Sequence, residues 1–438
     1  MGWAIFDNLL QRGCNVVRMN AQQIDWVIRR TLAAVDPYVA VLRHASLQGA
    51  VLRVDEATYD LSGKDIRLVA VGKAAVPMAR AVCELLGERI GRGVVATKYG
   101  HSETDQRRRT TDGGRQTARN SRLSSAVRRL RVIESAHPVP DENSLKAGEA
   151  ICDLLKDCTA DTLILVCVSG GASALVVAPQ VGISLKTLQA INGALLKSGA
   201  DIHEMNAVRS RLDRLKGGGL VRLAEPASVV SLILSDVIGD PLEVIASGIT
   251  NAPDAAQHLQ NVLVGNNTQA CEAAAQAVRE LGYAPKIVTT EMRGEARERG
   301  TEIAESILKA PAKTALIYGG ETTVNIRGEG LGGRNQEMTL AAAMVLGERS
   351  DVRYQTSESE ACVVIALGTD GTDGPTDAAG AIATRDTVRR AVALGLDAQD
   401  FLERNDSYHF FEALGDLIRM GPTGTNVADV VIAIAESG

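Results

Sequence analysis

Short apolar runs alternate with longer stretches of helical periodicity along most of the chain. In the first half, runs rich in Val, Ile and Leu cover 66–71, 94–96, 163–168 and 229–234. Helical periodicity follows most of them, as over 74–86, and a long helical stretch precedes them at about 21–46. Because strands buried on both faces are almost continuously apolar, this alternation predicts βαβ units around a parallel sheet.

The alternation changes in the middle of the chain. The stretch 249–306 is rich in Ala and predicts mainly helix, with a short strand near 286–289. Apolar runs then resume at 315–318, 323–326, 362–367 and 430–434. A chain of 438 residues is also too long for one ordinary core. We therefore predict two α/β domains: a larger one with a parallel sheet over 1–255, extended to about 310 if the helices belong to it, and a smaller one with a mixed sheet over 311–438.

Composition excludes several classes of protein. Apolar residues make up 45% and charged residues 23%, so disorder of the whole chain is excluded. A net charge of −6 argues against a general nucleic-acid binder, which needs clustered Lys and Arg. The longest apolar run, 163–178, is broken by Ser169, Gly170 and Gly171, so we predict no membrane segment.

Cysteine usage and the N-terminus bear on location. The seven Cys show no CxxC spacing, which favours reduced thiols, and the N-terminus lacks the apolar core of a signal peptide. We therefore expect a cytoplasmic protein. The segment 102–131 contains nine Arg without interleaved aromatic residues, so we interpret it as a solvated, mobile loop and not as a nucleic-acid arm.

Five segments place small or charged residues after strand-like runs, where ligands bind in open α/β sheets. In the first, Gly72 permits a sharp turn after 66–71, and Lys73 follows it. A lysine at this position can neutralise a phosphate as a point charge. A surface lysine in a tight turn is the equal alternative.

The second segment follows the most apolar run of the chain and comprises Ser169, Gly170, Gly171, Ala172 and Ser173. Paired glycines before a small-residue helix expose several backbone N–H groups, which suits a phosphate or carboxylate. The alternative is a helix-capping turn with Ser173 as the cap. We favour anion binding, because two consecutive glycines are needed where another group approaches closely.

The third segment is a turn that carries two carboxylates, Asp236 and Asp240, before Pro241. Asp236 is suited to holding Mg²⁺ or to accepting the proton of an attacking hydroxyl, and phosphoryl transfer needs both tasks done. Asp240 is the second candidate metal ligand. The alternative is that both aspartates only form Asx turns.

The fourth segment begins with three candidate nucleotide contacts, Gly319, Gly320 and Glu321. A formal GxGxxG follows at 328–333, but the residues before it alternate between polar and apolar. A dinucleotide fingerprint needs a buried apolar strand at that point, so we reject this interpretation. Instead we expect Arg334, with Asn335 beside it, to begin a helix and to grip a phosphate or carboxylate.

The fifth segment, 368–377, is dense in Gly, Thr and Asp. Its candidate contacts to a nucleotide or its metal are Thr369, Asp370, Gly371 and Asp373. An EF-hand calcium loop is the obvious alternative, but it needs Glu at its twelfth position, where this chain has Ala381. A solvated turn is the other alternative.

Other catalytic motifs are absent from the sequence. There is no GxxxxGK[ST], HExxH or GxSxG. His137 precedes Pro138, and a rigid turn accounts for it without catalysis. The remaining histidines have no partner by spacing, so we predict neither a metal cluster nor a Ser/His/Asp triad.

A set of motifs spread from about Ile24 to Ile434 carries a family resemblance. They are VGKAA, ESAHPVPDEN, VSGGASAL, HEMNAVRSRLDRLKGGGL, LSDVIGDP with ASG, GGETTV, GGRNQE, GTDGTDGPTDAAG and GPTGTNVAD. Together they resemble the class II glycerate kinases, which are often named hydroxypyruvate reductases. The resemblance implies a larger Rossmann-like, three-layer N-terminal domain, a smaller C-terminal domain of the MOFRL type and an active site between them.

The resemblance also implies an activity and residue roles. The activity would be transfer of phosphate from ATP, with Mg²⁺, to D-glycerate, at the 2-hydroxyl to give 2-phosphoglycerate. Lys73, Asp236 and Arg334 would form the catalytic trio, and Lys73, Arg334 and Asn335 would contact the substrate. The chain departs from the family pattern at the Arg-rich 102–131, at Ile249 where Pro is usual, and in an extension before Met19.

Two other functions stay open at this stage. The GxGxxG at 328–333 is the support for an NAD(P)H-dependent hydroxypyruvate reductase. A non-catalytic protein that binds small anions is the second alternative, although acidic and basic groups converging on one site argue against it. The oligomeric state is open between a monomer and a homodimer.

Overall fold

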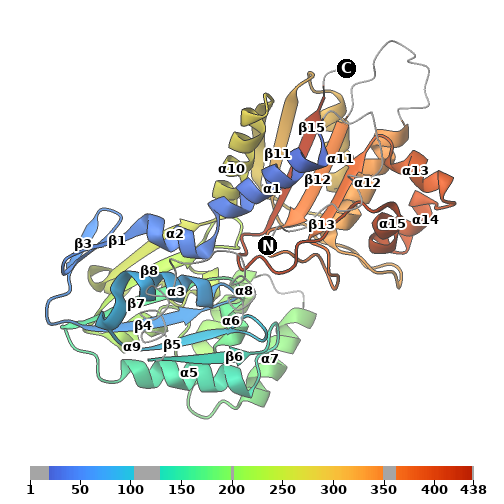
Figure 1. Cartoon of the computed structure of the whole chain (residues 1–438). Helices are drawn as coiled ribbons and strands as arrows, with labels where there is room; N and C mark the ends of the chain where they lie inside the picture. Colours follow the sequence, from blue (N-terminus) through green and yellow to red (C-terminus); the bar gives the residue numbers. More distant parts are fainter. Residues whose placement is uncertain (1–18, 103–128, 199–201, 349–361, 437–438) are drawn as a thin grey trace. The chain divides into compact units, whose positions relative to one another are not determined.

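The computed structural model describes residues 19–102, 129–198, 202–348 and 362–436. The chain divides into two compact units, which we describe separately (Figure 1). Unit 1 contains 36–266 and 424–426, and unit 2 contains the described residues of 2–35, 267–423 and 427–438. The Arg-rich loop predicted at 102–131 and the extension predicted before Met19 lie almost entirely outside the described residues.

The division at Asn266 lies within the stretch between 255 and about 310 where the sequence left the domain boundary open. One element is assigned differently from the expected domains. The N-terminal helix α1 (Ala21–Ala34) belongs to unit 2, although it precedes unit 1 in the chain.

Unit 1 is built around a six-stranded, fully parallel sheet with the order β6-β5-β4-β7-β8-β9. The strands are β4 (Asp65–Val71), β5 (Ile90–Lys98), β6 (Leu130–Ser135), β7 (Thr162–Val168), β8 (Ser228–Leu234) and β9 (Leu259–Gly265). The chain fills one side of β4 first and then the other, so the strand order reverses between β4 and β7. This is the order of a Rossmann-like fold, in which ligands bind at the carboxyl ends of the strands beside that reversal.

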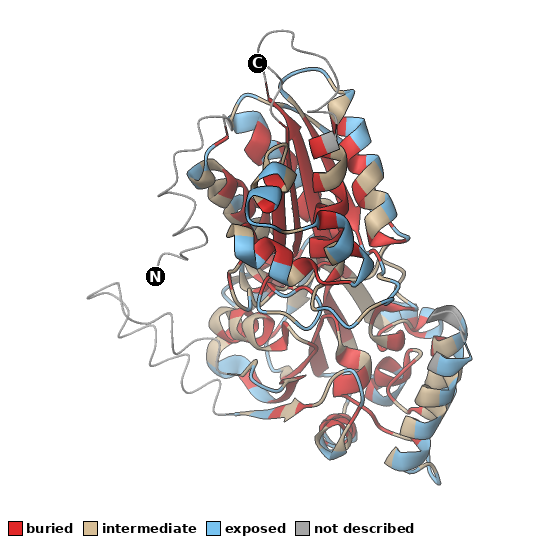
Figure 2. Cartoon of the chain, turned by 90° about the vertical axis from the view of Figure 1, so that its right-hand side faces the viewer, coloured by how far each residue is buried: buried red, intermediate tan, exposed pale blue. Residues whose placement is uncertain are grey.

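Helices cover both faces of this sheet, as predicted for buried parallel strands (Figure 1). Every residue of β7 is buried, and Figure 2 shows the strands as the buried layer. The helices of unit 1 are α2 (Pro37–His44), α3 (Ala75–Leu86), α5 (Glu142–Leu155), α6 (Ala172–Leu175), α7 (Leu185–Lys197), α8 (Ile202–Leu212) and α9 (Gly219–Ala224). A separate antiparallel sheet contains the short strands β1 (Ala45–Gln48), β2 (Val51–Val54) and β3 (Ala57–Asp60). On one face, the side chains of Val69 and Val166 pack with those of Ile151 from α5 and Leu220 from α9.

Unit 2 contains a six-stranded mixed sheet with the order β10-β11-β15-β12-β13-β14. The strands are β10 (Ala284–Met292), β11 (Thr314–Gly320), β12 (Cys362–Gly368), β13 (Gly380–Thr384), β14 (Leu417–Ile418) and β15 (Asp429–Ala435). Only β10 and β11 pair in parallel, and β15 runs antiparallel between β11 and β12. The predicted fold class, a Rossmann-like parallel-sheet domain plus a smaller mixed-sheet domain, is therefore confirmed.

Helices also enclose the sheet of unit 2. They are α10 (Asn267–Glu280), α11 (Ala296–Leu308), α12 (Arg334–Glu348), α13 (Thr387–Ala393), α14 (Ala398–Glu403) and α15 (Ser407–Leu414). Helix α12 contributes Met338 and Ala342 to a core with the sheet and α11, and Leu340 to a second core that contains Phe410 and Phe411. Because α12 is buried on two sides, the residue at its first position, Arg334, is fixed by packing on both.

The local predictions differ from the structure at several places: strands β1, β2, β3, β6 and β14 were not predicted, and three further differences follow. No strand forms at 323–326, where Thr323 makes only an isolated bridge and Asn325 bonds to the side chain of Glu295. Strand β9 lies within the stretch predicted as mainly helical, because Gln260 and Asn261 interrupt its apolar run. Strand β13 was not predicted, since its small residues form no apolar run.

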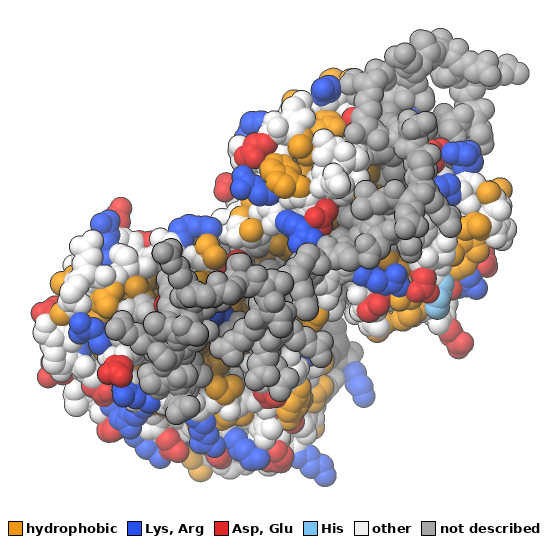
Figure 3. All heavy atoms as spheres, in the orientation of Figure 1, with side chains coloured by type: hydrophobic (Ala, Val, Ile, Leu, Met, Phe, Trp, Pro, Cys, Tyr) orange, Lys and Arg blue, Asp and Glu red, His pale blue; other side chains and the backbone are white. Residues whose placement is uncertain are grey.

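Two further observations concern the helices and the surface. Within the described ranges, no helix combines the length and apolarity needed to cross a membrane. On the face shown in Figure 3, Lys and Arg side chains lie interspersed with Asp and Glu.

Helix α1 gives a test of the unit assignment. Its buried residues Ile24, Val27 and Ile28 follow helical spacing, and the helix packs against α10. We predict that Ile28→Ala lowers the free energy of unfolding of unit 2 by about 2–5 kcal/mol, since it removes a fully buried side chain. Hydrogen exchange measured by mass spectrometry should show faster exchange in α10 and β11, with unit 1 unchanged. The exposed Gln22→Ala is the control, and faster exchange confined to unit 1 would contradict the assignment.

Candidate active site

The carboxyl ends of three neighbouring strands in unit 1 carry the predicted residues. Lys73 follows β4, the loop Ser169–Ser173 follows β7, and Asp236 follows β8. The backbone N–H of Lys73 donates to the carbonyl of Gly170 over 2.9 Å. The N–H of Ala74 donates to Oγ of Ser169 over 3.0 Å. The structure therefore joins the first two predicted segments at the reversal of strand order.

Two glycines permit this close approach. Gly72 has a φ of +119°, and a Cβ on it would lie 2.3 Å from both the carbonyl oxygen and Oγ of Ser169. A Cβ on Gly170 would lie 1.9 Å from Oδ2 of Asp236. Any side chain at either position would force the segments apart, so Gly72 and Gly170 set the contact between the ends of β4, β7 and β8.

The loop Ser169–Ser173 has the properties of an anion-binding loop. Among the residues that the structure describes, the N–H groups of Gly170, Gly171, Ala172 and Ser173 have no hydrogen-bond acceptor. Gly171 adopts a left-handed φ of +85°. Successive backbone N–H groups in such a turn favour a negatively charged ligand. The alternative, Ser173 as a helix cap, is wrong, because α6 begins after Gly171 without a side-chain cap.

A buried polar network lies against the end of this loop. Nζ of Lys216 donates to the carbonyl of Ser173 over 2.8 Å and lies 3.6 Å from Oδ2 of Asp213. The hydroxyls of Ser173 and Ser247 are 2.8 Å apart, and Ser247 donates to Oδ1 of Asn206 over 3.0 Å. Burial lowers the pKa of Lys216, and Asp213 opposes that shift. No role could be assigned from the sequence to Lys216, Asp213, Ser247 and Asn206, because only the fold brings them to the loop.

Asp236 and Asp240 occupy different positions in their turn. Oδ2 of Asp236 accepts a hydrogen bond of 2.9 Å from Asn426, and this carboxylate borders Gly170. Asp240 has a φ of +54°, and its Oδ2 accepts a hydrogen bond of 2.6 Å from Asn266. Within the described part of the chain, no three His, Cys, Asp or Glu side chains form a group that could hold a metal. Mg²⁺ is commonly held by one or two carboxylates together with substrate phosphates, and Asp236 beside the loop fits that mode.

His137 also lies at this site, which the sequence analysis did not expect. A Cβ on Gly171 would lie 3.2 Å from Cδ2 of His137 and 3.4 Å from Cγ of Lys73, so the two side chains border the same glycine. Burial, with the charges of Lys73 and Lys98, lowers the pKa of His137 to about 4. The imidazole is therefore neutral at pH 7.

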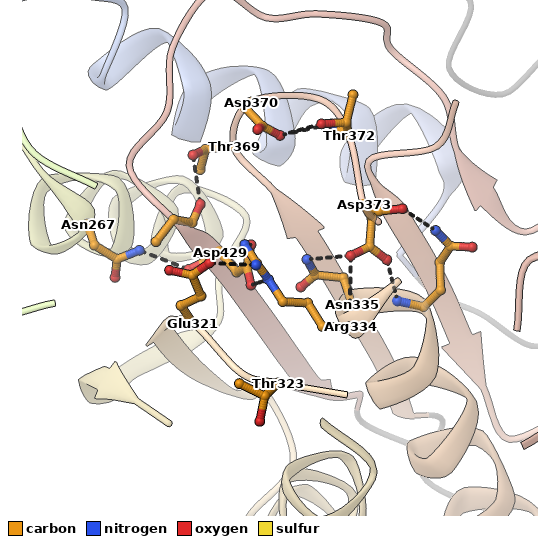
Figure 4. Close-up of polar contacts among 12 residues, drawn as sticks. Asn267, Glu321, Thr323, Arg334, Asn335, Thr369, Asp370, Thr372, Asp373 and Asp429 are labelled. Atoms are coloured by element: carbon orange, nitrogen blue, oxygen red, sulfur yellow. Dashed lines mark hydrogen bonds and ion pairs between the residues drawn. The ribbon is translucent and has the colours of Figure 1, made fainter. Parts of the chain in front are cut away.

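Unit 2 brings together the predicted residues that follow β11 and β12. Asp429, the first residue of β15, pairs with Gly320 in one neighbouring strand and with Gly368 in the other. Arg334 begins α12, and Figure 4 shows its guanidinium directed at Asp429 and Glu321. Nε donates to Asp429 over 2.5 Å, Nη2 to the same carboxylate over 3.0 Å, and Nη1 to Glu321 over 2.5 Å.

The ion pairs of Arg334 with Asp429 and Glu321 dominate the electrostatics of this cluster. Burial works against the charge of Arg334, but Asp429 and Glu321 outweigh it and raise the pKa of the guanidinium. Burial raises the pKa of Asp429, and Arg334 opposes that shift. Asp429 is 1% exposed, whereas Arg334 is 34% exposed and Glu321 46%. A ligand can therefore reach Arg334 on its exposed side, where Glu321 lies, while the buried Asp429 fixes the guanidinium.

Asp373 holds the start of α12. Its two carboxylate oxygens accept from the N–H groups of Asn335 over 3.0 Å and Gln336 over 2.8 Å (Figure 4). It is 2% exposed, and Asn335 is fully buried. The structure thus uses Asp373 as a helix cap from a distant loop, and the nucleotide contact predicted for it and the substrate contact predicted for Asn335 stay predictions.

The remaining residues of the fifth segment join neighbouring loops. Thr369 donates through Oγ1 to the carbonyl of Ala428 over 2.7 Å and accepts from the N–H of Val427 over 2.8 Å. Oδ1 of Asp370 accepts from Thr372 (Figure 4). A Cβ on Gly371 would lie 2.0 Å from the carbonyl of Gly421. This segment is a turn held by its own side chains, on the same edge of the sheet as Asp429.

Packing accounts for the glycines of the fourth segment. A Cβ on Gly319 would lie 1.8 Å from Asn267, and one on Gly320 would lie 2.3 Å from the carbonyl of Met292. In the GxGxxG, Gly328, Gly330 and Gly332 approach the residues 404–407 closely. No strand ends directly before this GxGxxG, since β11 ends at Gly320, so the segment lacks the strand–turn–helix context of a dinucleotide site.

The raised pKa of Asp373 gives a test of its position. Burial raises the pKa of this carboxyl from 3.8 to about 6, so the folded state binds its proton more tightly than the unfolded chain. The resulting stability is present below pH 3.8 and is lost as the pH rises through about 6. At about 1.4 kcal/mol per pKa unit, the loss is at most about 3 kcal/mol.

We therefore predict that the free energy of unfolding of Asp373→Asn rises relative to that of the wild type as the pH is raised from 4 to 7. Denaturant unfolding at several pH values measures this difference. Asp397→Asn, at an exposed cap of α14, is the control and should show no such trend. A difference between Asp373→Asn and the wild type that does not change with pH would contradict the assigned burial.

Comparisons with known proteins agree with both units. The family model "Domain of unknown function (DUF4147)" matches residues 23–281, and the MOFRL family model matches 314–429. D-glycerate 2-kinase of Thermotoga maritima is 39% identical over 87% of this chain and 93% of its own length. Glycerate 2-kinase of Pyrococcus horikoshii is 34% identical over 94% and 96%.

A solved structure agrees with the fold as well. The crystal structure of glycerate kinase from Thermotoga maritima superposes with a TM-score of 0.77 at 36% identity, covering 94% of this chain and 99% of that one. The predicted resemblance is confirmed by these matches. The chain therefore belongs to the family defined by the DUF4147 and MOFRL domains, whose members include the glycerate 2-kinases.

Proposed function

We propose that this protein is an ATP-dependent D-glycerate kinase that phosphorylates the 2-hydroxyl and produces 2-phosphoglycerate. The observation that carries the proposal is the loop Ser169–Ser173, in which the N–H groups of 170–173 have no acceptor among the described residues and which borders Lys73 and Asp236. A phosphate-binding loop, a cation and a carboxylate at the ends of adjacent strands are what phosphoryl transfer requires. The full-length relatives named glycerate 2-kinases supply the substrate class.

The proposed roles follow from the geometry of each residue. The N–H groups of Gly170–Ser173 bind phosphate oxygens, and Lys73 neutralises charge beside them. Asp236 orients the substrate hydroxyl and accepts its proton as the hydroxyl oxygen bonds to phosphorus and the bond to ADP breaks. Mg²⁺, held by Asp236, would neutralise phosphate charge when bound. Arg334, oriented by Asp429, is the proposed cationic contact of unit 2.

The finer predictions on nucleotide, metal and location belong to the same proposal. ATP is the expected phosphate donor. Each aspartate accepts one side-chain amide hydrogen bond, and Asp236 is the stronger candidate metal ligand than Asp240 because it borders Gly170 of the loop. The six cysteines that the structure describes are free thiols, which is consistent with the expected cytoplasmic location. The GxGxxG, which no strand directly precedes, gives the reductase alternative no structural support.

The reaction itself is the first prediction to test. Purified protein with ATP, Mg²⁺ and D-glycerate should release ADP, and ³¹P NMR should identify the product as 2-phosphoglycerate. Formation of 3-phosphoglycerate would correct the position of attack and keep the kinase. NADH oxidation with hydroxypyruvate, in the absence of ADP release, would overturn the proposal in favour of a reductase.

Lys73 and Lys64 flank opposite ends of β4 and allow a matched pair of variants. Lys73 follows the carboxyl end of β4, whereas Lys64 precedes its other end and bonds to Asp161. We predict that Lys73→Ala lowers kcat by about 10²-fold or more, because a preorganised cation stabilises the charge that develops in the transition state. Lys64→Ala should retain wild-type kcat. Normal kcat in a correctly folded Lys73→Ala protein, verified by circular dichroism, would remove Lys73 from the mechanism.

A further inference from the structure

We propose that His137 is a substrate-binding residue of this enzyme, and that its imidazole donates a hydrogen bond to the carboxylate of D-glycerate. The proposal rests on the glycerate kinase function proposed above. It adds two things to that function. The first is a binding residue, His137, which the sequence pattern had assigned to a rigid turn, and the second is the group of the substrate that this residue contacts.

The position of His137 supports the proposal first. Its imidazole and the side chain of Lys73 border Gly171, with 3.2 Å from the site of a Cβ on this glycine to Cδ2 of His137 and 3.4 Å to Cγ of Lys73. Gly171 is the central residue of the loop proposed to bind phosphate. A ligand held by that loop and by Lys73 therefore lies beside His137.

The second support is that the ring of His137 lacks hydrogen bonds to the described residues. Neither ring nitrogen has a hydrogen-bond partner among the residues that the structure describes. The side chain is nevertheless half-buried. A histidine with a purely structural role usually orients its ring through one of the two nitrogens, so a half-buried ring without such a partner is suited to a ligand.

The surrounding charges indicate which group of the ligand is bound. Lys73 and Lys98 act on His137 and, with burial, keep the imidazole neutral. Three carboxylates of this region accept hydrogen bonds from other groups: Glu134 from the N–H of Gly100, Asp141 from the N–H of Ser144, and Asp236, beside Gly170, from Asn426. The environment of His137 is thus positive, which favours an anionic group. The loop N–H groups take the phosphates, so the carboxylate is the anionic group of D-glycerate that remains for this position.

A neutral imidazole suits this task. It presents one N–H donor, and it adds no third positive charge beside the two lysines. The hydrogen bond to a carboxylate is charge-assisted and contributes more than a bond between neutral groups. Losing it should weaken glycerate binding by about 10-fold or more, since bonds to charged groups are worth about 1.5–3 kcal/mol.

Steady-state kinetics provide the first test. For His137→Ala we expect KM for D-glycerate to rise by about 10-fold or more, with KM for ATP within about 3-fold of wild type. His137→Gln, which retains an N–H donor, should recover part of the loss. His44→Ala, in the same unit and bonded to Asp55, is the control and should leave both constants unchanged. Equal increases in both KM values, or a lower thermal midpoint without a change in KM, would overturn the proposal.

Imidazole NMR provides a second test that does not depend on turnover. With ¹⁵N-histidine labelling, the His137 signal is identified as the one that disappears in His137→Gln. Adding D-glycerate without nucleotide should shift this signal and raise the pKa of His137, because a bound carboxylate favours the charged imidazole. Glycerol, which lacks the carboxylate, should do neither.

The outcomes separate this inference from the proposed function. A signal that responds to ATP and not to D-glycerate would assign His137 to the nucleotide and overturn the inference, while wild-type kinase activity would stand. No kinase activity in the wild type would overturn the proposed function, and a response to D-glycerate in the same protein would still support a carboxylate contact at His137.

Discussion

The contact between the carboxyl ends of β4 and β7 is the constraint on which the candidate site of unit 1 depends. It consists of the hydrogen bond from the N–H of Lys73 to the carbonyl of Gly170 and the close approach of Gly72 to Ser169. The strand order reverses between these two strands, and in folds of this type ligands bind at the carboxyl ends beside that reversal. The glycines are required here by contact distance, and Gly72 also by its positive φ.

In unit 2, an ion pair positions the candidate site residue Arg334. Arg334 is placed by α12, which is fixed by packing on two sides and capped by Asp373 from a distant loop. Asp429 then sets the direction of the guanidinium from the first residue of the central strand. A buried carboxylate without a partner would be destabilising, so Asp429 and Arg334 depend on one another. The exposed bond to Glu321 is the weaker part of the cluster, since surface ion pairs contribute little.

Much of the fold could be predicted because its information is local. Continuous apolar runs identified β4, β7, β8, β12 and β15, and the residues at their ends identified most of the candidate site. What the sequence did not reveal depends on tertiary contacts. Lys216 and Ser247 meet the loop only after the chain folds, and Asp373 caps a helix whose second residue, Asn335, lies 38 residues earlier. Asp429 stood in the motif GPTGTNVAD without an assigned role, because its pairing with Arg334 is a tertiary contact. The alternating residues at 323–326 have the pattern of a strand, but Asn325 bonds to Glu295 instead.

Glycine-rich segments show why residue type alone leaves function undetermined. Gly72, Gly170, Gly328 and Gly330 all permit close packing of one chain segment on another, yet the first two bring chemical groups to a site and the last two only fix a loop. Gly171 differs from them, because it lies in a turn whose N–H groups have no acceptor among the described residues. The distinguishing property is therefore the fate of the backbone hydrogen bonds around a glycine. This property depends on strand order and on contacts distant in sequence, so a motif supports a function only once the fold has placed it.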